Sequence, residues 1–78
     1  MATDTVKIVL HIDEELDDQS RDELQKSLIE SQGIVEAHIN EQRHHLMLVD
    51  YQPKMIDTNQ VLKTVISKGV HAELIGGI

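Results

Sequence analysis

Five histidines and one acidic loop carry the groups of this chain that could take part in chemistry. The histidines are His11, His38, His44, His45 and His71. The loop runs from Asp13 to Asp18. Imidazole and carboxylate groups together are typical ligands of Zn(II), Ni(II), Cu(II), Co(II) and iron. Cysteine is absent, so the chain has neither a disulfide nor a thiolate metal site, and Cu(I) is not a favoured ion.

Four predicted strands position these groups, because apolar residues alternate with polar ones along four segments. The segments are residues 6–12, 34–40, 44–51 and 70–75. Pro53 ends the third strand, since proline cannot continue a hydrogen-bonded ladder. The polar residues 40–43 predict a hairpin turn between the second and third strands. The side chains expected to face the core are Ile8, Leu10, Ile12, Val35, Ala37, Ile39, Met47, Val49, Tyr51, Val70, Ala72 and Leu74.

Two helices are predicted between the strands. Ser20 followed by Glu23 has the spacing of a capping box, and Gly33 stands at the usual left-handed stop. The second helix is expected to begin near Asp57, with a glutamine three residues later, and to end at Gly69. The apolar stripes of the two helices are Leu24, Leu28, Ile29, Val61, Leu62, Val65 and Ile66.

The resulting order is βαββαβ, a fold of the α+β class. Right-handed crossovers place the first strand beside the third and give an antiparallel sheet in the order 4-1-3-2. Both helices then cover one face of the sheet, and the other face stays open. We expect one domain over residues 1–78, with its core in about residues 5–75 and a short loose tail at residues 76–78.

This arrangement predicts a row of histidines on the open face. Successive strand residues alternate between faces, which leaves His45 pointing inward or lying at the margin. The other four share one end of the sheet, about 5 Å from neighbour to neighbour. Their expected order is His71, His11, His44 and His38. The row depends on strand register, because a slip of one residue moves a side chain to the other face.

Imidazoles at that spacing could share one metal ion. Asp13 and Asp17, in the loop that leaves the first strand at the same end, are candidate carboxylate ligands. The row could also act as a pH switch, since histidine titrates near neutrality. The plainer alternative is that each histidine is only a solvated strand residue.

Along residues 6–74 the chain resembles the heavy-metal-associated domain family. That family has a first strand, Gly-Met-x-Cys-x-x-Cys, a helix ending in Gly-Val, a hairpin ending in Val-x-Tyr-Asp-Pro and a second helix ending in Gly-Tyr. The matching segments here are Gly33-Ile34, Val49-Asp50-Tyr51-Gln52-Pro53 and Gly69-Val70. The resemblance implies a ferredoxin-like βαββαβ sandwich and a role in metal transport or homeostasis.

The metal motif of that family is absent from this chain. Asp17 and Ser20 stand where the resemblance places the two cysteines, and Glu15 stands where it places the methionine. Two soft thiolates for Cu(I) are therefore missing. We expect either a domain that binds a divalent metal through histidine, or one that has kept the fold and lost the metal.

The composition argues against several other functions. The net charge of -7, with 14 acidic and 7 basic residues, opposes nucleic-acid binding. Tyr51 is the one aromatic residue, so strand aromatics for base stacking are missing. No serine stands in a nucleophile motif, so we expect no enzyme. We expect no membrane span and a cytoplasmic location, because apolar runs are short and residues 1–4 do not resemble a signal peptide.

The open face also predicts a protein partner. Val9, Leu46 and Leu48 should point outward beside the histidine row, with Ile34 and Ile75 at the edges. An apolar sheet face is typical of a contact surface. We expect a homo-oligomer, and the alternative function is a metal-free interaction or oligomerisation module that acts through this face.

Overall fold

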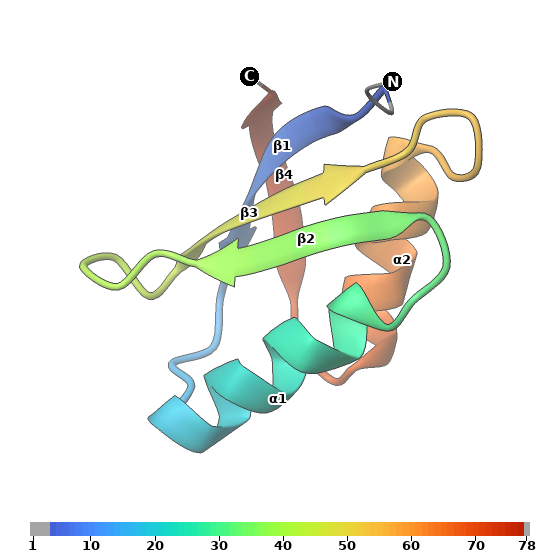
Figure 1. The fold of residues 1–78 in the computed structure, drawn as a ribbon. Helices are drawn as coiled ribbons and strands as arrows, with labels where there is room; N and C mark the ends of the chain where they lie inside the picture. Colours follow the sequence, from blue (N-terminus) through green and yellow to red (C-terminus); the bar gives the residue numbers. More distant parts are fainter. Residues whose placement is uncertain (1–3, 78) are drawn as a thin grey trace.

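Strands and helices alternate along the chain in the predicted order βαββαβ (Figure 1). The structure, a computed structural model, describes residues 4–77. Its elements are β1 (Val6–Ile12), α1 (Asp18–Ile29), β2 (Ile34–Ile39), β3 (Leu46–Tyr51), α2 (Thr58–Ser67) and β4 (Ala72–Gly77).

The strands form one antiparallel sheet in the order β2-β3-β1-β4. This order confirms the predicted topology, and both helices lie on the same side of the sheet (Figure 1). The ferredoxin-like sandwich is therefore the fold of the chain. One sheet face is left without a covering layer among the described residues.

The core lies between the sheet and the two helices. Leu24 and Leu28 of α1 and Val61 and Val65 of α2 are buried against it. No polar or charged residue is buried among residues 4–77, so burial of apolar surface stabilises the fold. The sheet side of the core consists of Ile8, Leu10, Ile12, Ile34, Ala37, Ile39, Met47, Val49, Tyr51, Val70 and Ala72.

The two helices begin at aspartates. Asp57 caps α2 as predicted, in a capping box completed by Gln60. The prediction for α1 is wrong by three residues: the cap is Asp17, whose carboxylate accepts a hydrogen bond from the Ser20 amide at 2.8 Å. An ionised carboxylate binds the exposed amides of a helix start at least as well as a hydroxyl does, so the earlier residue takes the position.

The hairpin between β2 and β3 is longer than predicted. β3 begins at Leu46 rather than at residue 44, so His44 and His45 lie in the turn. The Asn40 side chain accepts hydrogen bonds from the amides of Gln42 and Arg43, at 2.8 and 2.9 Å. These bonds close the turn locally and hold residues 41–44 out of the ladder.

Two strands depart from simple alternation because of bulges. In β2 the register shifts between Ile34 and Glu36, so Ile34 is buried and Val35 is exposed, the reverse of the predicted pattern. In β4 the register shifts where Leu10 pairs with Leu74 and Val9 pairs with Gly76, and the strand continues beyond this bulge. Each bulge inserts one extra residue, which reverses the face of the residues beside it.

β4 is also displaced from its predicted range of residues 70–75. It begins at Ala72 and continues to Gly77, where Gly76 pairs with Val9 and Gly77 pairs with Ile8. The predicted loose tail is therefore wrong for these two glycines, while Ile78 lies outside the described residues. Leu74, expected in the core, is 46% exposed because β4 is an edge strand.

Candidate functional site

Two histidines meet at the end of β1. His11 is the last outward-facing residue of this strand, and His45 lies across from it in the hairpin turn. Their imidazole rings are stacked, with centroids 5.7 Å apart and planes inclined by 16°. The backbone supports the contact, because the Ile12 amide donates to the His45 carbonyl oxygen at 2.8 Å.

The neighbours of the two rings indicate which nitrogen carries the proton. His45 Nδ1 lies 2.7 Å from the Ile12 carbonyl oxygen, which can only accept a hydrogen bond. His11 Nδ1 lies 3.2 Å from a carboxylate oxygen of Asp13. Both contacts favour a proton on Nδ1. In the neutral rings the lone pair for a ligand is then on Nε2.

His71 has a different partner. It lies in the turn before β4, and its Nδ1 is 2.5 Å from Glu14 Oε2. The His71 amide donates to the other carboxylate oxygen of Glu14 at 2.7 Å, and the Asp13 amide donates to the His71 carbonyl oxygen at 2.9 Å. The side-chain hydrogen bond raises the pKa of His71, and it lowers the pKa of the Glu14 carboxyl.

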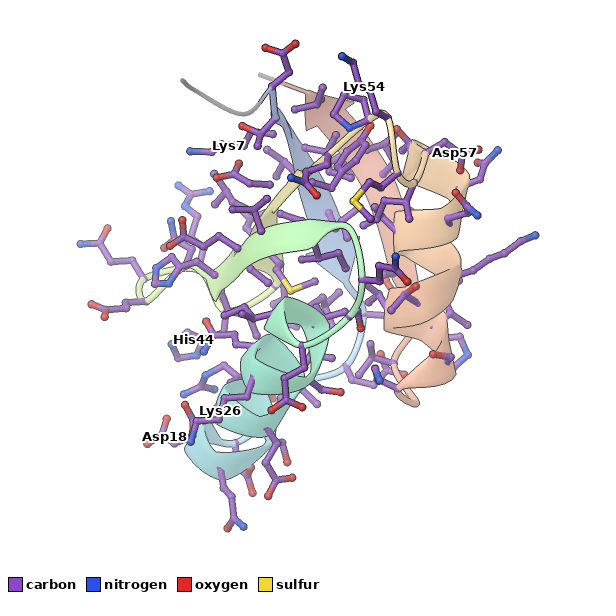
Figure 2. All side chains as sticks on the ribbon, turned by 45° about the vertical axis from the view of Figure 1, so that its right-hand side comes forward. Lys7, Asp18, Lys26, His44, Lys54 and Asp57 are labelled. Carbon is purple, nitrogen blue, oxygen red and sulfur yellow. The ribbon has the colours of Figure 1, made fainter. Side chains whose placement is uncertain are left out.

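The remaining histidines, His38 and His44, line one cavity between α1 and the hairpin, together with Asp22 and Asn40. His38 faces outward from β2 opposite Leu48. Figure 2 shows His44 on the same side of the molecule as Asp18 and Lys26 of α1. Both histidine side chains are exposed.

The predicted row of four histidines across the sheet does not form. The residue opposite His11 is Leu46 in β3 and Glu73 in β4. His44 and His71 stand outside the strands because β3 and β4 begin two and one residues later than those positions. Among residues 4–77, no group of three or more histidine or carboxylate side chains is placed to hold a metal ion. Metal binding by the individual residues stays a prediction.

The acidic loop is used mainly for structure. Asp17 caps α1, and its hydrogen bonds with Ser20 lower the pKa of its carboxyl. Leu16 packs against the core, and its carbonyl oxygen accepts from the Arg21 guanidinium, which also contacts the Asp18 carboxylate. Of the two aspartates predicted as ligands, only Asp13 lies beside a histidine of the stacked pair.

Two contributors to this end of the molecule were not anticipated. Glu14 is separated from its partner His71 by 57 positions, so no local pattern could indicate the contact. Glu15 lines a cavity with His11, His44 and His45. Membership of the acidic loop was a sequence signal for both residues, and the resemblance also set Glu15 at the position of the family's methionine.

The predicted interface residues divide into two groups. Val9 pairs with Leu48 in the centre of the open face, and Leu46 pairs with His11 beside them. All three are partly buried by their neighbours. Ile75, at the edge of β4, is 53% exposed.

Solved copper-binding domains share this fold. The N-terminal domain of a potential copper-translocating P-type ATPase from Bacillus subtilis, in its Cu(I)-loaded state, is similar with a TM-score of 0.82 at 22% identity, covering 95% of this chain and 91% of that chain. The copper(I)-loaded first domain of the human copper chaperone for SOD1 is similar with a TM-score of 0.79 at 16% identity, covering 96% of this chain and 99% of that chain. A copper-binding domain from HMA7, a P-type ATPase, is similar with a TM-score of 0.82 at 14% identity, covering 92% of this chain and 96% of that chain.

At these identities the likeness shows the fold alone, and at that level it agrees with the predicted resemblance to heavy-metal-associated domains. No model of a protein family matches the sequence, and no curated protein matches it. Neither helix in residues 4–77 has the length and apolar character needed to cross a membrane.

Proposed function

We propose that this protein binds a divalent transition metal ion through the imidazoles of His11 and His45 and serves in metal handling. The observation that carries the proposal is the stacked pair, with each Nδ1 beside an oxygen acceptor. Histidines that ligate metals commonly donate the second ring N–H to a carboxylate or a backbone carbonyl, which orients the ring. Asp13 and the Ile12 carbonyl supply these acceptors here.

The donor set favours particular ions. Imidazole nitrogen and carboxylate oxygen suit Zn(II), Ni(II), Cu(II) and Co(II), whereas Cu(I) prefers thiolate or thioether sulfur. Because no third histidine or carboxylate of residues 4–77 is placed to join the pair, water would take the remaining positions on the ion, in the cavity that Glu15 and His44 also line. Of the other predicted ligands, Asp13 takes an orienting role, and His71 and Asp17 are bound to partners of their own.

The position of the pair supports this proposal. The similar structures are described as copper-binding or copper-loaded domains. The resemblance to the heavy-metal-associated family places the cysteine pair of that family at Asp17 and Ser20, in the loop after β1 and the first turn of α1. His11 stands at the end of β1, so the proposed site lies where this segment begins.

Calorimetric titration of the metal-free protein with Zn(II), Ni(II), Co(II) and Cu(II), combined with NMR of the histidine rings, tests the proposal. Saturable binding should shift the ring signals of His11 and His45 first. His11→Ala and His45→Ala should each weaken binding by about 100-fold or more, since each removes a ligand. His38→Ala is the matched control and should leave affinity unchanged. Absence of saturable binding, or equal affinity in all three variants, would contradict the proposal.

The open face supports a second candidate, an interaction module that works without metal. Val9, Leu46 and Leu48 lie next to one another there, and the Lys7–Asp50 ion pair, at 4.0 Å, borders them. Val9→Glu and Leu48→Glu should abolish capture of a partner protein and leave metal affinity unchanged. Retention of the partner by both variants would rule out this face.

A further inference from the structure

One peptide group links the two acceptors that orient the stacked histidine rings. The Ile12 carbonyl oxygen lies 2.7 Å from His45 Nδ1. The N–H of the same peptide group, on Asp13, donates to the His71 carbonyl oxygen at 2.9 Å. The Asp13 carboxylate in turn lies 3.2 Å from His11 Nδ1. A peptide group is planar and rigid, so a rotation that breaks its bond to His71 also moves its carbonyl oxygen, and this one contact bears on both rings.

This peptide group lies where the ladder between β1 and β4 ends. β1 ends at Ile12 and β4 begins at Ala72, and these two residues form the last pair. The bond from Asp13 to His71 comes one residue beyond that pair on each side. Backbone hydrogen bonds at the end of a ladder open most readily, so this bond depends on support from side chains.

Glu14 supplies that support. Its Oε1 accepts from the His71 amide at 2.7 Å, and its Oε2 lies 2.5 Å from His71 Nδ1. The carboxylate therefore holds both the N–H and the ring of the residue whose carbonyl oxygen binds Asp13. Hydrogen bonds to an ionised carboxylate are roughly twice as strong as those between neutral groups. Two consecutive loop residues thus bind His71, one through its backbone and one through its side chain.

We propose that Glu14 and His71 are positioning residues for the stacked pair, an inference that rests on the proposed metal site. They fix the peptide group between Ile12 and Asp13. Its carbonyl oxygen then stays on the His45 ring, and the Asp13 carboxylate stays on the His11 ring. Both rings keep the proton on Nδ1 and present Nε2 to a ligand. Glu14 and His71 act through this peptide group and not as ligands.

NMR of the histidine rings in the metal-free protein tests the positioning by itself. Ring nitrogen shifts, recorded with the rings in their neutral form, distinguish a proton on Nδ1 from one on Nε2. Glu14→Ala should move His11 and His45 from the Nδ1-protonated form toward a mixture of both. Glu14→Gln should restore most of the natural spectrum, since its amide oxygen can accept from the His71 amide and its NH₂ group can donate to the neutral ring. Glu23→Ala, which removes an exposed carboxylate of α1, is the control and should leave both rings unchanged.

Titration with Zn(II) measures the consequence for metal binding. Glu14→Ala should weaken binding about tenfold, the lower end of the range for loss of an orienting partner, because it acts one step further from the rings. Glu14→Gln should recover most of the affinity, and Glu23→Ala should bind as the natural chain does. Coupling between two sites is reciprocal, so saturating Zn(II) should slow exchange of the Asp13 amide by a similar factor. Circular dichroism checks that each variant is folded.

The outcomes separate this inference from the proposed function. Unchanged ring signals in Glu14→Ala would overturn the inference whether or not the protein binds metal. Full Zn(II) affinity in Glu14→Ala, when His11→Ala has lost it, would overturn the inference and leave the proposed function standing. Equal effects of Glu14→Ala and Glu23→Ala would assign the change to net charge and also overturn it. If the natural chain binds no metal, the proposed function fails, and the ring signals alone decide the positioning role.

Discussion

His71 Nδ1 lies 2.5 Å from Glu14 Oε2, and the amide of the same histidine donates to Glu14 Oε1 at 2.7 Å. One carboxylate thereby fixes the loop after β1 to the turn before β4. The pair spans 57 positions of sequence and ties the segment beside the proposed metal site to the edge strand.

This pair predicts a stability window in pH. The pKa of His71 is raised above its ordinary 6.5, so its contribution is complete below about pH 6.5 and is lost as pH rises through the folded value. The pKa of Glu14 is lowered below 4.5, so its contribution is present above about pH 4.5 and is lost as pH falls through the folded value. Asp13 adds to the raised pKa of His71.

Denaturant unfolding of the natural chain and of Glu14→Gln across pH 3–9 measures this effect. The stability difference between them should be largest between about pH 4.5 and 6.5 and should shrink on both sides. Glu15→Gln, which alters the next carboxylate, should show no such maximum. A difference that does not vary with pH would contradict the prediction.

Asp13 should tune metal affinity without being a ligand. Asp13→Asn keeps the size of the side chain and removes the charge that favours a proton on His11 Nδ1. Loss of such an orienting partner typically weakens metal binding about 10–100-fold. Titration of the variant checks this, with Asp22→Asn as a distant control. Unchanged affinity in Asp13→Asn would show that the ring is oriented by other contacts.

Two cysteines introduced at the positions given by the resemblance should create a site for Cu(I). The Asp17 carboxylate reaches the Ser20 amide at 2.8 Å, so these two residues are neighbours at the start of α1. Asp17→Cys combined with Ser20→Cys should bind Cu(I) in competition with a chelator, because thiolates at a helix N-terminus have lowered pKa values. Asp17→Cys alone should bind much more weakly. Failure of the double variant to compete would show that this loop cannot present two thiolates together.

Removal of either helix cap should destabilise the fold. Asp57→Ala and Asp17→Ala each remove a side-chain acceptor for a helix amide, which costs about 1 kcal/mol. Asp57→Asn and Asp17→Asn retain an acceptor oxygen and should recover most of that free energy of unfolding. Urea unfolding at pH 7 measures all four variants. Equal losses in the alanine and asparagine variants would point to helix-dipole charge rather than hydrogen bonding.

Alanine substitutions at Gly33 and Gly69 should distinguish the cost of backbone strain from the cost of side-chain crowding. Both have positive φ, at 89° and 94°, a region in which a side chain costs about 1–2 kcal/mol. A Cβ at Gly33 would also lie 3.0 Å from Ile56 atoms, whereas a Cβ at Gly69 would meet nothing within 4 Å. Gly33→Ala should therefore lower the free energy of unfolding more than Gly69→Ala. Equal losses would show that the Ile56 side chain moves aside without cost.

Local patterns were enough to predict the elements and their order. Alternating apolar residues in β1, the capping box at Asp57 and the position of Pro53 each report on chemistry within a few residues. Burial and backbone hydrogen bonding act at that range, so the sheet order and most of the core follow from the chain itself. The absence of cysteine likewise excludes a thiolate site on composition alone.

The strand register and the contacts between distant side chains were determined only by the tertiary structure. The Asn40 turn and the bulges beside Val35 and Val9 moved residues by one or two positions. The row of histidines is missing because His44 and His71 precede β3 and β4, and because His11 is paired with Leu46 and Glu73 instead. The tertiary structure put His11 against His45 and Glu14 against His71 instead. Contacts between residues 33 or more positions apart depend on how the whole sheet closes, and no local pattern encodes them.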